Sequence, residues 1–124
     1  MPFDAAILFA HGARDARWGE PFFVMRDTLR ARLGDVHVGL AFMEYAEPTL
    51  SQAIDEAYAK GARRMLLVPI FLSGGGHVLK DLPPMIAAEK ARYADLDLVV
   101  SGAIGEEPEV RQGMMDAVVR LTRA

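Results

Sequence analysis

Four apolar runs alternate with segments of helical spacing, and this order constrains the fold of the chain more than any other feature. The runs cover residues 5–10, 36–43, 64–72 and 96–104. The first and third are nearly continuous in Ile, Leu, Val and Phe, which is typical of strands covered on both faces in a parallel sheet. Parallel strands need crossover connections, which are usually helices.

The segments between and after the runs carry apolar residues at offsets of three and four, as amphipathic helices do. The clearest sets are Phe22, Met25, Leu29 and Leu33; Leu50, Ile54, Ala57 and Tyr58; and Val110, Met114, Val118 and Leu121. Pro21, Pro48 and Pro108 stand near the starts of these segments, where a missing N–H costs little. A fourth helix with a weaker pattern is predicted over residues 84–93.

The alternating order predicts an α/β fold, with an open, four-stranded, mainly parallel sheet and helices on both faces. Pro69 lies inside the third run, so we expect an irregular strand there. Gly34 and Gly61 stand where helix C-caps belong. A chain of 124 residues is the size of one domain, and we expect residues 1–124 to form a single unit.

Composition excludes several classes of function. The net charge of −3 makes nucleic acid an unfavourable partner. The chain has no cysteine, which leaves any metal to His, Asp or Glu. The first 15 residues contain no leading positive cluster, and their apolar run is too short for a signal or membrane segment. We therefore expect a cytoplasmic protein that has no membrane partner.

The residues after each run matter most for function, because open α/β sheets bind ligands outside the carboxyl ends of their strands. His11 follows the first run, Glu44 the second, the loop Gly74-Gly75-Gly76-His77 the third, and residues 102–106 the fourth. Two histidines and a carboxylate are thus expected on one rim. These donors suit a divalent first-row metal, although their spacing does not choose which one.

Each residue also has a structural interpretation. A single histidine after a strand is more often a loop or capping residue than a ligand, and Glu44 alone is an ordinary surface carboxylate. Glu47 fits the dipole at the start of the second helix, and His37 is interpreted as structural. The glycine run lacks the spacing of nucleotide-binding loops, which leaves close approach of a flat ligand or simple flexibility.

Three stretches together resemble a known family. They are LFAHGARDARWGEPF, FMEYAEPTL and VPIFLSGGGHVLKDLP, and the combination resembles the short CbiX-type sirohydrochlorin chelatases, which insert a metal into a tetrapyrrole. The resemblance covers essentially the whole chain and implies a chelatase-like, flavodoxin-like half-domain. It implies that His11 and His77 are metal ligands and proton acceptors. It also implies that Glu44 is a third ligand or proton acceptor.

The implied substrate carries many carboxylates, so its cleft needs cations. Arg14, Arg17 and Lys80 flank the two histidine motifs and are candidates to bind those carboxylates, with solvated surface charge as the alternative. Gly75 and Gly76 are candidates for close approach of the macrocycle. Met43, Phe71 and Leu72 are assigned either to contact with the ring face or to core packing.

The resemblance also implies a partner. Larger chelatases of this fold resemble two such halves facing each other across a cleft, so this shorter chain is expected to form a homodimer, with Met114 and Met115 among the contributing residues. The implied activity is insertion of Co²⁺, or else Fe²⁺ or Ni²⁺, into sirohydrochlorin without a nucleotide. The pathway is left open between cobalamin, sirohaem and a nickel tetrapyrrole.

Two alternatives compete with this activity. A non-catalytic carrier of metal or tetrapyrrole would use the same ligands without turnover. A flavodoxin-like regulatory domain would bind a phosphate or a partner through the glycine loop, and would leave both histidines without a purpose.

Overall fold

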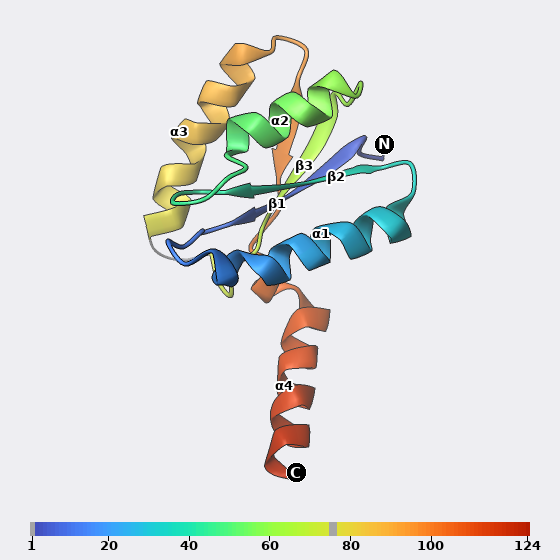
Figure 1. Ribbon diagram of the computed structural model, residues 1–124, viewed down its shortest axis with the longest axis vertical. Coiled ribbons are helices and arrows are strands. Elements are labelled where there is room, and N and C mark those ends of the chain that lie inside the picture. The colour runs from blue at the N-terminus through green and yellow to red at the C-terminus, as the bar shows by residue number, and fades with distance from the viewer. Residues whose placement is uncertain (1, 75–76) are drawn as a thin grey trace.

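The protein forms a four-stranded sheet in the order β2-β1-β3-β4 (Figure 1). The computed structural model describes residues 2–74 and 77–124, with the side chains of residues 77–79 outside that description. The strands are β1 (Ala5–Ala10), β2 (His37–Phe42), β3 (Arg64–Pro69) and β4 (Asp97–Val100). All three strand pairings are parallel, which confirms the predicted α/β fold.

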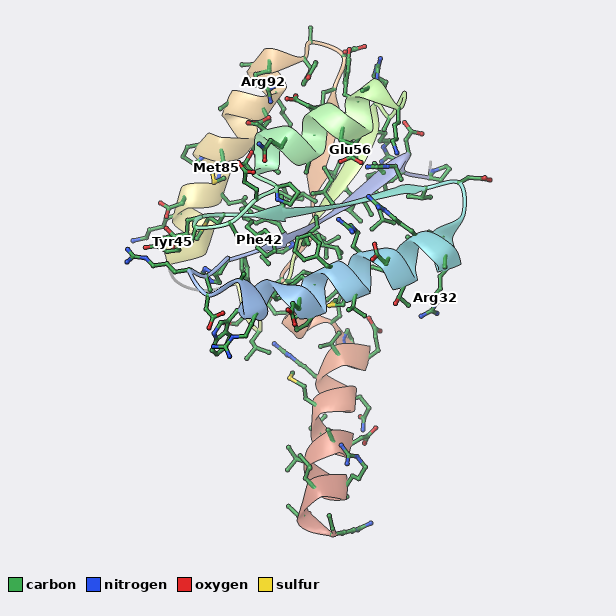
Figure 2. The ribbon with its side chains drawn as sticks, viewed as in Figure 1. Arg32, Phe42, Tyr45, Glu56, Met85 and Arg92 are labelled. Carbon is green, nitrogen blue, oxygen red and sulfur yellow. The ribbon has the colours of Figure 1, made fainter. Side chains whose placement is uncertain are left out.

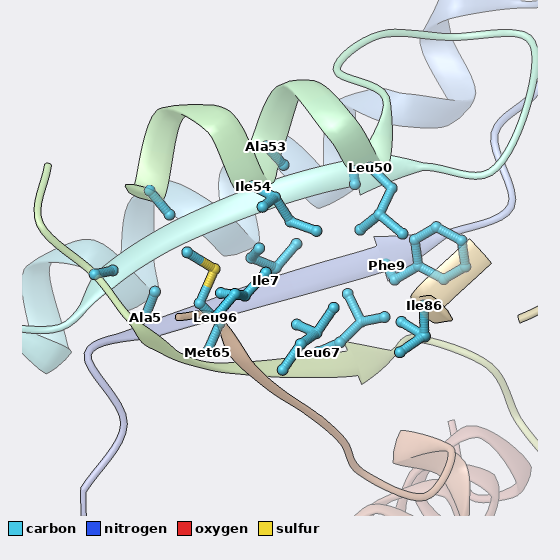
Figure 3. Packing of buried hydrophobic residues seen from close by; sticks show 14 of the residues in the cluster. Ala5, Ile7, Phe9, Leu50, Ala53, Ile54, Met65, Leu67, Ile86 and Leu96 are labelled. Carbon is cyan, nitrogen blue, oxygen red and sulfur yellow. The ribbon is translucent and has the colours of Figure 1, made fainter. Parts of the chain in front are cut away.

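Helices cover the sheet unevenly. The helix α1 (Glu20–Leu33) lies on one face, while α2 (Leu50–Ala59) and α3 (His77–Arg92) lie on the other (Figure 1). The main core fills the space under α2 and α3, with Ile7, Phe9 and Leu67 at its centre (Figure 3). Leu8, Leu40 and Phe42 form a smaller cluster toward α1. Alternate residues of each strand thus supply two separate layers.

Local sequence explains where the helices begin and end. At the start of α2, the Thr49 hydroxyl accepts from the Gln52 amide, and the Gln52 side chain accepts from the Thr49 amide, which forms a capping box. Gly34 and Gly61 have φ angles of 59° and 97°, which confirms the predicted helix-terminating role of both glycines.

The third helix begins earlier than its sequence pattern indicates. It starts at His77 instead of residue 84, and it contains Pro83 and Pro84. Both prolines lie on the exposed side of the helix, so the carbonyl groups that lose their amide donors can face solvent. The buried side chains Leu82 and Ile86 hold this part of α3 on the sheet. Packing therefore outweighs the local signal for a helix start.

Strands β3 and β4 are shorter than the apolar runs that contain them. Pro69 is the last residue of β3 and pairs with Phe9, so its missing amide falls at the end of the strand. The irregularity predicted at Pro69 is therefore the point where the strand ends. The expected strand over residues 96–104 covers only Asp97–Val100. After one further hydrogen bond, from the Ser101 amide to the Leu67 carbonyl, the chain turns into the 3₁₀ segment η2 (Ile104–Glu106).

The last helix, α4 (Pro108–Thr122), extends away from the sheet (Figure 1). The structure describes all its residues, and none of them is buried. Its predicted apolar face is present but uncovered, with Met114, Met115, Val118, Val119 and Leu121 exposed. No helix within residues 2–74 and 77–124 is both long enough and apolar enough to span a bilayer.

Because α4 does not pack on the sheet, one face of β3 and β4 is not covered by any helix among the described residues. Met65, Leu67 and Leu98 point into the main core, so the alternating residues Leu66, Val68 and Val99 point to the opposite face. There α1 packs on β2, at the far side of the sheet. Leu66 and Val68 are only half-buried, and Val99 is 36% exposed.

His37 starts β2 at the amino edge of the sheet, opposite the end where His11 lies. Its Nε2 is buried and has no hydrogen-bond partner among the described residues. Burial lowers the pKa of His37 below its ordinary value, with Glu56 acting in the opposite direction. The imidazole is therefore held in its neutral form, consistent with the structural interpretation of this residue.

Candidate functional site

A cavity of about 460 Å³ opens at the carboxyl edge of the sheet. Its walls come from the loop after β1, from the 3₁₀ segment η1 (Ala16–Gly19), from the first turn of α1 and from the loop after β2. The aromatic wall consists of Trp18, Phe22, Phe23, Phe42 and Tyr45, of which Figure 2 labels Phe42 and Tyr45. The polar lining consists of His11, Arg14, Asp15 and Glu47. A ligand with a flat apolar body and a polar edge matches these walls.

His11 is exposed at the rim of this cavity, directly after β1. Its ring lies against that of Phe71, with 4.5 Å between the centroids and 54° between the planes. Phe71 in turn meets the fully buried Phe9 edge-on at 6.2 Å. The imidazole therefore rests on a side chain that is anchored in the core.

Backbone contacts hold the loops after β1 and β2 together. The Glu44 amide donates to the His11 carbonyl at 3.1 Å. Gly12 has φ of 85°, and a Cβ there would come within 1.9 Å of the Glu44 carbonyl oxygen. Only glycine fits this backbone. The contact brings the backbones of two predicted site residues, His11 and Glu44, side by side, with the Glu44 side chain exposed.

The predicted cations are placed differently from one another. The Arg14 guanidinium lies over the Tyr45 ring at 4.9 Å, within the cavity lining. Arg17 instead makes an ion pair with Asp15 at 2.7 Å and is not among the lining residues that the structure describes. Hydrogen bonds from Arg17 lower the pKa of the Asp15 carboxyl. Lys80 is exposed in the first turn of α3.

The second predicted ligand falls at the limit of what the structure describes. His77 is the first residue of α3, but its side chain lies outside the description, as do the predicted substrate-binding residues Gly75 and Gly76. Among the described residues, no group of three or more His, Cys, Asp or Glu side chains is arranged to hold a metal. A metal bound by His11 thus needs a further donor, and the predicted ligand His77 remains a prediction.

Sequence reasoning missed most of the aromatic wall. The sequence pattern places Phe22 on a helix face and Phe42 in a strand, and it indicates no role for Trp18 and Tyr45. The available signal was the density of aromatic residues around the first motif, because Trp18, Phe22 and Phe23 closely follow His11 in the sequence. Phe71 was assigned either to ring contact or to the core, and its ring contacts both His11 and Phe9.

A family model named CbiX matches residues 5–121 of this sequence. The chain belongs to the CbiX family. Among curated proteins it is similar to the sirohydrochlorin cobaltochelatase of Methanocaldococcus jannaschii, with 32% identity over 83 residues that cover 67% of this chain and 58% of that protein. The sirohydrochlorin cobaltochelatase of Saccharolobus islandicus is 24% identical over 118 residues, which cover 90% of this chain and 91% of that protein.

Two solved structures have the same fold. The CbiX protein from Marinobacter aquaeolei VT8 aligns with a TM-score of 0.84 and 32% identity, covering 97% of this chain and 98% of that chain. SirB from Bacillus subtilis with Fe³⁺ aligns with a TM-score of 0.79 and 22% identity, covering 90% of this chain but 44% of that chain. The CbiX chain described here therefore corresponds to less than half of SirB.

Proposed function

We propose that this CbiX-family protein inserts a divalent metal into sirohydrochlorin, with Co²⁺ the first choice and Fe²⁺ or Ni²⁺ next. The observation that carries the proposal is the exposed imidazole of His11 on the rim of an aromatic-walled cavity. The names of the curated relatives point to this substrate and to cobalt. The proposal takes residues 1–124 as one unit that works in the cytoplasm, and it leaves the pathway open.

In this proposal His11 and His77 hold the metal beside the macrocycle. Insertion expels two pyrrole protons, and a neutral imidazole can accept one of them. Glu44 is the third candidate, since its backbone is fixed next to that of His11 and its carboxylate is exposed. The groups that hold the metal and those that accept the protons would thus lie on one rim of the sheet.

The remaining predicted residues bind the substrate. Arg14 is the best placed, because its guanidinium lies in the cavity lining and can form paired hydrogen bonds with a carboxylate. Lys80 offers a point charge at the start of α3, and Gly75 and Gly76 would let the ring approach the backbone. Arg17 would have to exchange its ion pair with Asp15 for a substrate carboxylate.

The first test is the initial rate of metal insertion into sirohydrochlorin, followed by absorbance with Co²⁺, Fe²⁺ and Ni²⁺ in parallel. For a metal that the protein uses, we expect the insertion rate with protein to exceed the rate without protein. The reason is that the bound metal and the tetrapyrrole ring no longer have to meet in solution. Tight binding of metal or tetrapyrrole without any acceleration would instead identify a carrier.

We further propose that the protein is a homodimer whose chains exchange α4. A helix of 15 residues that buries none of its side chains is marginal in water, so α4 needs a surface to cover its apolar face. On the open part of the sheet, marked by Leu66, Val68 and Val99, no helix among the described residues covers the strands. A second copy supplies both the surface and the helix with twofold symmetry.

The length of related proteins also favours a second copy as the occupant of this surface. The chain covers 44% of SirB, as expected if two copies take the place of one longer chain. The Arg111 guanidinium, in the first turn of α4, donates to the Gly105 carbonyl at 3.2 Å, which ties the start of α4 to the preceding segment η2.

Replacing Val118 with lysine is expected to convert the dimer to a monomer of 13.6 kDa, because Val118 is 59% exposed on the apolar side of α4. Light scattering after size exclusion measures the mass. Gln112→Lys is the matched control: it adds the same charge on the polar side of α4, where Asp116 lies one turn away, and it should remain dimeric. A monomeric wild type would contradict the dimer.

Crosslinking distinguishes exchange from other dimers. Since the chain has no cysteine, Thr122→Cys gives one site for a photoreactive benzophenone at the end of α4. In a mixture of ¹⁴N and ¹⁵N chains, exchange predicts crosslinks from one isotope to β3, β4 or α1 peptides of the other. Crosslinks confined to the same chain, or to the other α4 alone, would overturn the exchange.

A further inference from the structure

The connection between β4 and α4 lies against the residues that follow β3. The Gly105 amide donates to the Phe71 carbonyl at 2.9 Å. Gly105 is buried, and a Cβ there would come within 2.2 Å of the Leu72 carbonyl oxygen and 2.5 Å of the Leu72 Cα. Two backbone segments are therefore in direct contact, with no room for a side chain between them.

A side chain completes this contact. One carboxylate oxygen of Glu106, Oε1, accepts from the Gly74 amide at 2.8 Å. Glu106 lies in η2, which immediately precedes α4. Together the two hydrogen bonds fix both ends of the segment 71–74, one at Phe71 and the other at Gly74. A hydrogen bond to a charged acceptor contributes more than one between neutral groups.

The fixed segment carries the side chain against which His11 rests. Phe71 presents its ring to His11 at 4.5 Å and its carbonyl to Gly105. On the other side the Phe71 ring meets the edge of the Phe9 ring at 6.2 Å and packs against the main core. The Phe71 backbone is held in addition from the β4–α4 connection, through the hydrogen bond that the Gly105 amide donates to its carbonyl.

We infer that Glu106 is a positioning residue for the His11 imidazole, acting through the segment 71–74 and the Phe71 ring. The inference rests on the proposed role of His11 for its consequence in catalysis. It concerns a different element from the cavity, because Glu106 follows β4 and is absent from the described cavity lining. Loss of a hydrogen-bond partner of a metal ligand typically costs 10- to 100-fold in affinity or activity, and Glu106, which acts on His11 indirectly, is expected at the lower end of this range.

A purely local role for Glu106 is the competing explanation. Acidic residues near a helix N-terminus stabilise the helix through its dipole, and Glu106, Glu107 and Glu109 all lie near the start of α4. Glu107 makes no side-chain capping hydrogen bond there. Glu107→Ala therefore removes the charge next to α4 while it leaves the Gly74 contact intact, which makes it the matched control for Glu106→Ala.

The experiment records the imidazole proton resonances of the full-length protein by NMR, without metal or substrate. The chain has three histidines, so the signals of His11 can be assigned with single His→Ala variants. Phe71→Leu, which removes the aromatic ring beside His11, sets the size of the expected shift. Hydrogen exchange of the Gly74 amide is measured on the same samples.

Glu106→Ala is expected to move the His11 resonances in the same direction as Phe71→Leu and to speed exchange at Gly74. Glu106→Gln should restore both signals, because its amide oxygen still accepts from Gly74, and Glu107→Ala should leave both unchanged. Faster exchange at Gly74 with unmoved His11 resonances would overturn the inference, as would equal effects of Glu106→Ala and Glu107→Ala.

Kinetics then test the consequence for catalysis. With the initial-rate assay described above, Glu106→Ala should lower kcat about tenfold with little change in KM, and Glu106→Gln should recover most of the loss. If the wild type inserts no metal, the proposed function fails while the NMR result still decides the positioning role. If the wild type is active and Glu106→Ala is equally active, the inference alone fails.

Discussion

Replacing His11 with alanine is expected to lower the rate of metal insertion by at least about 100-fold, the range in which a positioned proton acceptor contributes. The physical reason is that the variant removes the exposed nitrogen donor from the rim of the cavity and leaves the cavity walls in place. Initial rates with Co²⁺ and sirohydrochlorin measure the effect, and calorimetry with Co²⁺ alone shows whether metal binding is lost in parallel.

The chain provides its own controls for this experiment. His37→Ala removes a histidine at the opposite edge of the sheet, so it should change stability but not the insertion rate per folded molecule. His77→Ala should resemble His11→Ala if both are ligands of one metal, and the double variant should lose little more than either single variant. Full activity in both His11→Ala and His77→Ala would refute the chelatase proposal.

Gly12→Ala is expected to destabilise the fold by roughly 3 kcal/mol. An alanine at φ of 85° costs about 1–2 kcal/mol, and forcing a methyl group against a neighbouring atom costs about 1–3 kcal/mol more. The neighbour is the Glu44 carbonyl oxygen at 1.9 Å, which belongs to the backbone and cannot rotate aside. Urea unfolding followed by circular dichroism measures the change.

Substitutions at two other glycines separate the backbone cost from the cost of the clash. Gly61 has φ of 97° and no described atom within 4 Å of an added Cβ, so Gly61→Ala should show the backbone cost without the clash. Gly113 lies in α4 with neither problem, so Gly113→Ala should stabilise the helix by about 1 kcal/mol. Equal effects of Gly12→Ala and Gly61→Ala would contradict the proposed contact between the β1 and β2 loops.

The class of fold was predictable because its signals are local. Continuous apolar runs such as residues 5–10 mark strands buried on both faces, and helices between them require parallel pairing. The boundaries of α3 were not predictable in this way, because Pro83 and Pro84 stop a helix only where packing does not hold it. The spatial order β2-β1-β3-β4 depends on long-range pairing, which no periodicity encodes.

The candidate site was predictable to a similar extent. His11 and Glu44 could be placed on one rim because the carboxyl ends of parallel strands meet at one edge. The partner of Arg17 could not be chosen in advance, since Asp15 and a substrate carboxylate offer its guanidinium the same chemistry. The hydrogen bond from Gly74 to Glu106 joins residues 32 positions apart, and nothing in either local sequence indicates it.

Because α4 extends away from the sheet, we expect the survival of this chain in a cell to depend on its concentration. No other part of the described chain covers the apolar face of α4. As long as the chain is a monomer, this face can bind other exposed apolar surfaces. If two chains pair as proposed, pairing is a second-order event, so dilute newly made chains spend the longest time as monomers and are the most open to proteases and to aggregation. Joining two copies into one polypeptide would then remove this delay, and such a fusion would act first on survival in the cell rather than on the chemistry at the rim.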